Sequence, residues 1–211
     1  MAIMGPDITK SALIIVDMQN DFLHEEGHFG KLAKERPERK IDREFLASTI
    51  PNVKRLSIAF REVGRSVVYI AHVLKSDYSD AAFPYWRHAP EVREFLVEGT
   101  WGSQITDELK PQKGEHLVIK KGYGGFNNTQ LDTILRNLGV NTCVITGVTT
   151  AVCISSTTRG GVELNYRMIV VSDATAETQR EIHEVELKNI ARAFADVNTT
   201  DEIIKMLKGI K

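Results

Sequence analysis

Short apolar runs rich in β-branched residues recur along this chain, and helix-like hydrophobic patterns separate most of them. This alternation is typical of a parallel sheet covered by helices on both faces. The runs predict six strands, at Ala12–Val16, Ser66–Val73, His116–Lys120, Thr142–Gly147, Arg167–Ser172 and, as a short edge strand, Asp196–Asn198. We therefore predict an α/β fold with three α/β/α layers around a doubly wound, mostly parallel six-stranded sheet.

Capping residues and glycines indicate where the intervening helices begin and end. Thr49 fits an N-cap followed by Pro51 in the first turn, and Gly64 ends that pattern. Thr199 and Glu202 have the spacing of a capping box for the last helix. Further helices are predicted at Thr129–Leu138, from about Ala151 or Cys153 onward, and at Thr178–Phe194.

Length and charge limit the kind of protein this is. The 211 residues favour a single domain over residues 1–211. Lys and Arg number 27 against 28 Asp and Glu, which gives a net charge of −1. The mixed stretch Lys31–Lys40 fits a solvated segment better than a phosphate-binding patch. A nucleic-acid partner is not expected, because such a surface needs clustered basic residues.

The small number of cysteines and the absence of long apolar runs predict where in the cell the protein is found. Cys143 and Cys153 are too few for a disulfide framework, which favours a reducing environment. The N-terminus does not resemble a secretion signal, and no run of 18 apolar residues occurs. We expect a cytoplasmic protein without membrane contact.

The functional side chains are expected where the predicted strands end. Asp17, His72 and Lys120 lie at the ends of three strands, and the turn Gly147–Cys153 follows a fourth. Open parallel sheets bind ligands at the carboxyl ends of their strands, near the point where the strand order reverses. We expect the ligand site there, with the long segment Lys75–Gly114 forming part of its wall.

Three of these positions together provide the groups for attack on a carbonyl-type carbon. Cys153 is expected near a helix start, where the helix dipole and a neighbouring cation stabilise a thiolate. Lys120 is long enough to supply that cation, and Asp17 can accept the thiol proton. Each residue taken alone also fits a simpler role: a small buried hydrophobe for Cys153, a surface charge for Lys120 and a turn residue or helix cap for Asp17.

Four segments resemble the isochorismatase-like cysteine hydrolases, which have a Rossmann-like fold, and the resemblance covers nearly the whole chain. Ala12–Phe22 (ALIIVDMQNDF) is similar to the family's first strand with its aspartate, and Val118–Phe126 (VIKKGYGGF) to its lysine segment. Gly147–Cys153 (GVTTAVC) looks like the nucleophile turn. Glu98–Ile105 (EGTWGSQI) resembles the corresponding segment of members that act on small amide and ureido substrates.

The resemblance implies a role for each matching residue. Asp17 is then the general base, Lys120 the charge partner and Cys153 the nucleophile that forms a covalent acyl intermediate. A cis peptide is implied at Val148–Thr149, with the amides of Thr149 and Cys153 forming an oxyanion hole. Relatives assemble into dimers or tetramers, so the resemblance also implies a homodimer or homotetramer.

The chain departs from the family at two places. Tyr123, Gly124, Gly125 and Phe126 stand where many relatives have Tyr-Ser-Ala-Phe, and Gly160 with Gly161 stand where many have Asp-Ala. The second pair is expected to weaken the helix after Cys153. Because neither change removes Asp17, Lys120 or Cys153, both bear on substrate choice more than on catalysis.

We expect no catalytic metal and no cofactor. Metal-binding nicotinamidases of the family use an Asp-x-His pair with further histidines, and only His72 matches that pattern here. Metal-free relatives that hydrolyse N-carbamoyl, biuret-like and ureidoacrylate-like compounds are therefore the better models. The string His24–His28 spells H-E-x-x-H, but a loop is predicted around Gly27 and Gly30 instead of the single helix that a zinc site requires.

Substrate-pocket candidates follow from the same strand ends and from the aromatic residues around them. They are Phe22, His72, Trp101, Tyr123, Phe126 and Val148. Core packing is an equally good interpretation for the aromatic members, and His72 also fits a core hydrogen-bonding role. Cys143, inside a predicted strand, is expected to be core.

The sequence thus predicts a cysteine amidohydrolase that cleaves the C–N bond of a small linear amide or N-carbamoyl or ureido compound and releases ammonia. Two alternatives stay open. One is vinyl-ether hydrolysis of the isochorismatase type, in which the aspartate is essential and the cysteine dispensable. The other is a non-catalytic small-molecule binder or a thiol redox sensor on the same fold.

Overall fold

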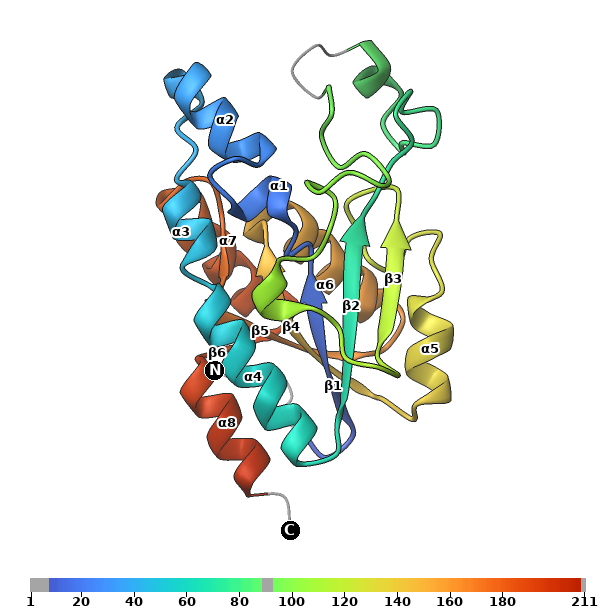
Figure 1. Ribbon diagram of the computed structural model, residues 1–211. Helices are drawn as coiled ribbons and strands as arrows, with labels where there is room; N and C mark the ends of the chain where they lie inside the picture. The colour runs from blue at the N-terminus through green and yellow to red at the C-terminus, as the bar shows by residue number, and fades with distance from the viewer. Residues whose placement is uncertain (1–7, 89–92, 210–211) are drawn as a thin grey trace.

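The computed structural model describes residues 8–88 and 93–209. Six strands form one sheet in the order β3-β2-β1-β4-β5-β6, and each neighbouring pair is parallel (Figure 1). Their bounds are β1 Ser11–Val16, β2 Ser66–His72, β3 His116–Lys120, β4 Thr142–Val148, β5 Arg167–Ala176 and β6 Asp196–Asn198. The order runs outward from β1 on one side and from β4 on the other, so it reverses between them. The predicted doubly wound, six-stranded α/β fold is confirmed.

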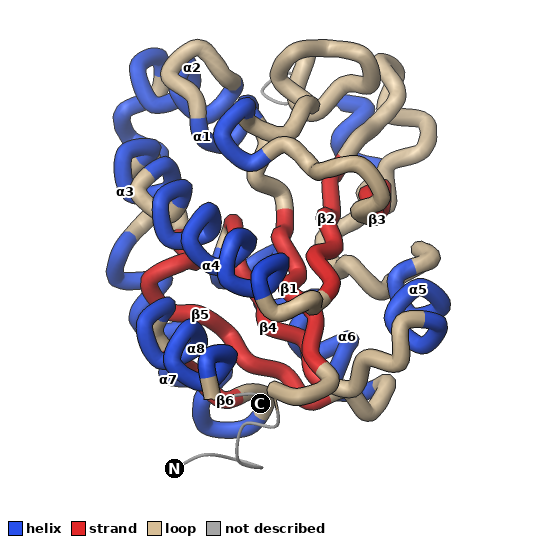
Figure 2. Tube along the Cα trace, turned by 60° about the horizontal axis from the view of Figure 1, so that its bottom comes forward, coloured by secondary structure: helices blue, strands red, loops and turns tan. Residues whose placement is uncertain are grey.

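Helices cover both faces of the sheet. On one face lie α4 (Ile50–Glu62) and α8 (Thr200–Lys208), which cross in front of the strands in Figure 2. On the other lie α5 (Leu131–Asn137), α6 (Ser155–Glu163) and α7 (Arg180–Ala193). Successive side chains of β1 alternate between the two cores, because strand residues point to opposite faces in turn. No helix of the described residues is long and apolar enough to cross a membrane.

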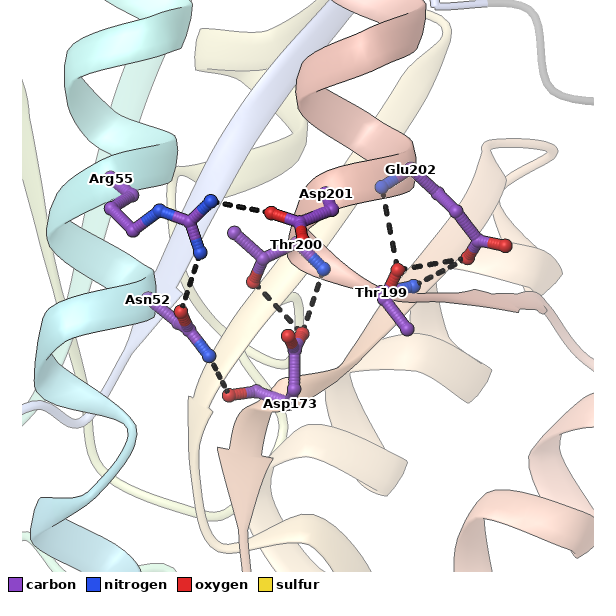
Figure 3. Close-up of polar contacts among 7 residues, drawn as sticks. All are labelled: Asn52, Arg55, Asp173, Thr199, Thr200, Asp201 and Glu202. Carbon is purple, nitrogen blue, oxygen red and sulfur yellow. Dashed lines mark hydrogen bonds and ion pairs between the residues drawn. The ribbon is translucent and has the colours of Figure 1, made fainter.

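A polar clamp joins α4 and α8 to the bend in β5 (Figure 3). The Asp173 carboxylate accepts hydrogen bonds from the backbone N–H and the hydroxyl of Thr200, at 2.7 and 2.8 Å. The Asn52 side chain donates to the Asp173 carbonyl at 2.8 Å, and Arg55 pairs with Asp201. The start of α8 is therefore fixed to both the sheet and α4. The capping box of Thr199 and Glu202 is present, as predicted.

Most predicted boundaries lie within a few residues of the observed ones. β3 and β6 have the predicted bounds, whereas β5 continues to Ala176 instead of ending at Ser172. Its pairing with β4 shifts between Ile145 and Gly147, and this irregularity allows the strand to continue past the polar residues in its middle. Thr49 precedes α4 as predicted, but its hydroxyl donates to the Leu46 carbonyl and does not cap the helix.

Residues 20–47 contain three short α-helices, α1 (Asn20–Leu23), α2 (His28–Glu35) and α3 (Arg43–Ala47), and a 3-10 helix at Pro37–Arg39. The loop predicted around Gly27 and Gly30 is wrong in part, because α2 begins at His28 and includes Gly30. A helical glycine costs about 1 kcal/mol relative to alanine. Packing of Phe29 against Phe22 and Phe95, with ring centroids 5.1 and 5.4 Å apart, favours the helix. The segment Lys31–Lys40 is exposed or half-buried, as expected of a solvated segment.

The long connection from β2 to β3 lies at the carboxyl end of the sheet, level with α1 and α2 (Figure 1). It contains short 3-10 helices at Pro84–His88 and Asp107–Leu109. Isolated bridges join Leu74 to Val97 and Gln19 to Ile105, so the segment is tied to the ends of both β2 and β1. This placement agrees with the expectation that it borders the ligand site.

Candidate active site

Asp17, Lys120 and Cys153 meet at the carboxyl edge of the sheet, as the sequence predicts. The Lys120 Nζ lies 2.9 Å from the Asp17 Oδ2 and 3.3 Å from the Cys153 Sγ. It also donates to the Gly122 carbonyl at 2.9 Å. The side chains of Asp17 and Lys120 are fully buried, and Cys153 is only 4% exposed. A carboxylate, an ammonium and a thiol therefore share one site closed to solvent.

The two central strands position the aspartate. Asp17 follows β1 directly, adopts φ +53° and donates its backbone N–H to the Ile70 carbonyl of β2 at 2.9 Å. On the other side, Gly147 of β4 pairs with Val16 and has φ +111°. A Cβ on Gly147 would lie 1.9 Å from the Val16 carbonyl oxygen, so only glycine permits this approach. The carboxylate thus leaves the sheet at the point where the strand order reverses.

The nucleophile turn is tied to the C-terminal part of the sheet. The peptide bond Val148–Thr149 is cis, as the resemblance implies. A π-helical turn, Thr150–Ile154, follows it and continues into α6, so Cys153 lies before the regular helix. The Glu177 carboxylate accepts the Ala151 N–H at 2.9 Å, and the Thr150 hydroxyl contacts the His183 Nδ1 at 2.8 Å. Thr149 and Cys153, the expected oxyanion-hole residues, lie at the beginning and within this turn.

Burial dominates the electrostatics of the site. Burial and the Asp17 charge raise the pKa of the Cys153 thiol, and Lys120 offsets this only partly. Burial likewise raises the pKa of Asp17 above its ordinary value against the opposing charge of Lys120. Burial lowers the pKa of Lys120, but Asp17 and Cys153 outweigh it and the ammonium keeps its proton. In this closed site burial therefore opposes the thiolate stabilisation that the sequence led us to expect, and it raises the pKa of the neighbouring carboxylate as well.

A family model described as the isochorismatase domain matches residues 11–202. The chain belongs to the isochorismatase family. The ureidoacrylate amidohydrolase RutB of Serratia proteamaculans is 34% identical, over 94% of this chain and 83% of that protein. The RutB protein of Agrobacterium fabrum is 32% identical, over 92% and 88%. The family membership predicted from the sequence is confirmed.

Solved structures of family members share the architecture. A cysteine hydrolase from Pseudomonas syringae pv. phaseolicola superposes with a TM-score of 0.87 at 28% identity, covering 99% of this chain and 97% of that one. The N-carbamoylsarcosine amidase from Thermoplasma acidophilum gives a TM-score of 0.72 at 31% identity, covering 91% and 97%. The sheet order and the layers described above are therefore those of this family.

Among the pocket candidates, His72 lies directly beside Lys120 in the sheet. It pairs in register with Lys120 on the neighbouring strand, so both side chains leave the same face of the sheet. The ring stacks on Trp86 with centroids 5.7 Å apart, and its Nε2 has no hydrogen-bond partner among the described residues. Burial, aided by the Lys120 charge, lowers the pKa of His72 to about 2, which keeps the ring neutral.

The other pocket candidates lie in different surroundings. Phe22 and Val148 are buried in the core, and Tyr123 stacks on Phe83 with centroids 4.0 Å apart. Phe126 stacks on Tyr166 on the side of the sheet covered by α5 and α6, with centroids 5.5 Å apart. Trp101 is 45% exposed and packs edge-on against His24. Their roles in substrate binding stay predictions.

A cleft at the same end of the sheet does not include the three central residues in its lining. It measures about 750 Å³ and lies between α2 and residues 93–102, with Asp21, His28 and Trp101 among its lining residues. The buried site is the better candidate for chemistry because the Cys153 thiol and both charged groups are there. The cleft is a neighbouring surface feature at the same end of the sheet.

Two residues that the sequence analysis did not assign hold the segments around the site. The Gln19 side chain accepts the His72 N–H at 2.9 Å and donates to the carbonyls of His72 and Ser103, at 2.9 and 2.8 Å. Asp21 accepts the N–H groups of Leu96 and His28, at 2.7 and 3.1 Å. In the sequence these residues stand out only as polar side chains two and four positions after Asp17, within the family-like segment Ala12–Phe22.

The structure shows where two further motifs of the sequence lie. His24 caps the end of α1 while His28 begins α2, so the H-E-x-x-H residues do not share one helix. Within the described residues, no group of three or more His, Cys, Asp or Glu side chains is arranged to hold a metal ion. The helix α6 runs through Gly160 and Gly161, because Phe126 and Met168 pack against these positions.

Proposed function

We propose that this chain is a cysteine amidohydrolase that cleaves the C–N bond of a small ureido, N-carbamoyl or linear amide compound and releases ammonia. The observation that carries the proposal is the Lys120 ammonium lying between the Asp17 carboxylate and the Cys153 thiol in a buried site. A thiol with an adjacent base and a fixed cation is the arrangement needed for nucleophilic attack on a carbonyl carbon.

The first half of the reaction makes the acyl intermediate. Asp17 takes the thiol proton as the Cys153 sulfur attacks the carbonyl carbon, and the charged Lys120 compensates the thiolate. The backbone N–H groups of Thr149 and Cys153 bind the oxyanion that forms. When the C–N bond breaks, Asp17 returns its proton to the leaving nitrogen, which departs as ammonia.

The second half releases the product. Asp17, again a carboxylate, removes a proton from a water molecule that attacks the carbonyl carbon bound to sulfur. The tetrahedral intermediate collapses, the C–S bond breaks and the thiol regains its proton. A ureido substrate leaves as a carbamic acid and an amide as a carboxylic acid. Lys120 stays charged throughout, because the neighbouring Asp17 and Cys153 hold its pKa above the ordinary value.

The named relatives support the substrate class. Ureidoacrylate amidohydrolases among the sequence relatives and an N-carbamoylsarcosine amidase among the solved structures both act on compounds that carry a terminal –NH–CO–NH₂ group or its N-substituted form. We place the substrate of this chain in the same class. The candidates Phe22, His72, Trp101, Tyr123, Phe126 and Val148 are proposed as its pocket.

We also propose a cytoplasmic homodimer or homotetramer formed from the single domain of residues 1–211. Exposed apolar side chains on α7 and on the edge strand β3 support an interface: Ile182, Val185, Leu117 and Ile119. The free and buried state of Cys143 and Cys153 fits a reducing compartment.

Ammonia release from a panel of small amides and ureides tests the activity. The panel holds N-carbamoyl amino acids, ureidoacrylate, biuret and nicotinamide, each assayed with the wild-type protein and with Cys153→Ala. We expect release from a ureido or N-carbamoyl compound that depends on Cys153. Turnover of a vinyl ether that survives Cys153→Ala but not Asp17→Asn would instead establish the isochorismatase-type reaction. Silence across the panel would contradict the proposal.

A further inference from the structure

Thr157, in the first turn of α6, joins the nucleophile turn to the turn that follows Lys120. Its side chain is fully buried. The hydroxyl donates to the Cys153 carbonyl at 2.7 Å and accepts the Gly125 N–H at 2.9 Å. Because the hydroxyl has one proton to donate, the direction of both hydrogen bonds is fixed.

The same two turns are also joined at the catalytic side chains. The Lys120 Nζ donates to the Gly122 carbonyl at 2.9 Å and to the Cys153 Sγ at 3.3 Å. The contacts therefore form a closed circuit, from the Cys153 sulfur through Lys120, Gly122, Gly125 and Thr157 back to the Cys153 carbonyl. Both ends of the circuit are atoms of the nucleophile residue.

The backbone of Gly125 lies close against the side chains of Ile70 and Thr157. A Cβ on Gly125 would lie 2.6 Å from the Ile70 Cδ1, 3.1 Å from the Thr157 Cγ2 and 3.2 Å from the Thr157 Oγ1. A residue with a Cβ at position 125 would displace the Ile70 and Thr157 side chains, and glycine avoids this displacement.

We propose that Thr157 is a positioning residue that fixes the separation of the Lys120 ammonium from the Cys153 sulfur by holding the turn 122–125 against the nucleophile. The inference deepens the proposed function, and only its kinetic test rests on that function. Without the hydroxyl, the turn loses its contact with the Cys153 carbonyl and Lys120 loses part of its fixed alignment. The Lys120 ammonium then stabilises the forming thiolate less. The attraction between the two charges falls steeply with their separation and with the entry of water.

The chain offers a matched control one residue further on. Thr158 is also fully buried and its hydroxyl donates to the Ile154 carbonyl at 2.8 Å, so this bond stays within its own helical segment. Thr157→Val and Thr158→Val each remove one buried hydroxyl of the same kind. Only Thr157→Val removes the contact with the Lys120 turn, while Thr157→Ser keeps it.

The first measurement is the rate constant for alkylation of Cys153 by iodoacetamide as a function of pH, followed on the Cys153 peptide by mass spectrometry. We expect Thr157→Val to lower this rate constant about tenfold at neutral pH, the effect of one charge-compensating contact, and to move the midpoint to higher pH. Thr157→Ser and Thr158→Val should stay within about threefold of wild type, since both keep the bond to Gly125. Equal rate constants for Thr157→Val and Thr158→Val would overturn the proposal, and so would faster alkylation of Thr157→Val.

The second measurement uses the substrate that the ammonia panel identifies. Thr157→Val should lower kcat about tenfold with less than a threefold change in KM, because the hydroxyl acts on the nucleophile and not on bound substrate. A change confined to KM would overturn the positioning role. If the panel is silent, the proposed function fails while the alkylation measurement still decides the role of Thr157.

Gly125→Ala disrupts the same hydrogen bond at its donor, the Gly125 N–H. It takes the place of Thr157→Val if Thr157→Val does not fold. It should reproduce the slower alkylation and the shift to higher pH. In the double variant the two effects should not add, because both remove one hydrogen bond. Wild-type alkylation in folded Gly125→Ala, or full additivity in the double variant, would overturn the proposal.

Discussion

At the scale of single residues, the site depends on one buried cation. Lys120 lies between the Asp17 carboxylate and the Cys153 thiol. Burial alone would favour the neutral form of both groups. Moving the thiol proton to Asp17 turns a carboxylate and a thiol into a carboxylic acid and a thiolate. The net charge of the site does not change. The raised pKa of Asp17 makes this carboxylate a stronger base than an exposed one, while the raised pKa of the Cys153 thiol opposes the transfer.

Lys120→Met should abolish activity and destabilise the fold. Removing one partner of a buried ion pair leaves Asp17 uncompensated and costs about 3–5 kcal/mol. Urea unfolding measures the stability and ammonia release the activity. Lys121→Met is the matched control, because its ammonium pairs with Asp80 at a partly exposed position, where such a pair contributes about 1 kcal/mol or less. Similar losses in the two variants would contradict the assignment of Lys120.

The pH dependence of kcat/KM should reflect the titration of Asp17. As the pH falls through the pKa of the folded protein, Asp17 gains a proton and cannot accept one from the thiol, so activity is lost on the acid side. Burial raises that pKa above its ordinary value of 3.8, so the loss begins at a higher pH than for an exposed aspartate. A profile of the activity between pH 3 and 8 checks this. An acid limb with its midpoint at or below 3.8 would contradict it.

At the scale of elements, side-chain hydrogen bonds between distant segments hold two regions of the molecule. One is the active-site end of the sheet, and the other is the face covered by α4 and α8. The Gln19 side chain links β1 to β2 and to the segment before β3, and Glu177 links the end of β5 to the nucleophile turn. On the face covered by α4 and α8, Asp173 fixes the start of α8 (Figure 3). We expect the hydrogen bonds of Gln19 and Glu177 to affect activity and those of Asp173 to affect stability.

Asp173→Ala should therefore lower stability and leave the activity unchanged. The Thr200 N–H and hydroxyl lose their acceptor, which costs about 1–3 kcal/mol when the groups are buried. Thr200 is fully buried, so the upper part of this range is expected in urea unfolding. Asp201→Ala breaks only the exposed pair with Arg55 and should cost about 1 kcal/mol or less. A smaller loss for Asp173→Ala than for Asp201→Ala would contradict the role of the clamp.

At the scale of the whole molecule, exposed apolar side chains lie on α7 as well as at the active-site end of the sheet. Val185 is 65% exposed and Ile182 lies one helical turn before it on α7. We expect light scattering with size-exclusion chromatography to give the mass of two or four chains. Val185→Glu should shift the mass toward one chain if α7 forms the interface, because it places a charge in an apolar contact. A wild-type mass of one chain would contradict the oligomer.

The sequence by itself determined the sheet, the family and the identity of the three central residues. The strands, the capping box of Thr199 and the glycines that end helices depend on local patterns, which neighbouring residues express without reference to the rest of the fold. Asp17, Lys120 and Cys153 could be grouped because the carboxyl ends of parallel strands share one edge of the sheet.

Only the tertiary structure decided how these residues behave. The thiol pKa is raised and not lowered, α2 forms across Gly30, and Gln19 and Thr157 connect segments far apart in the sequence. Burial, ring packing and hydrogen bonds between distant segments depend on where the whole chain places each group. These nonlocal terms outweigh local propensity where the two conflict, because desolvating a charge or packing an aromatic ring involves more free energy than a single helix preference.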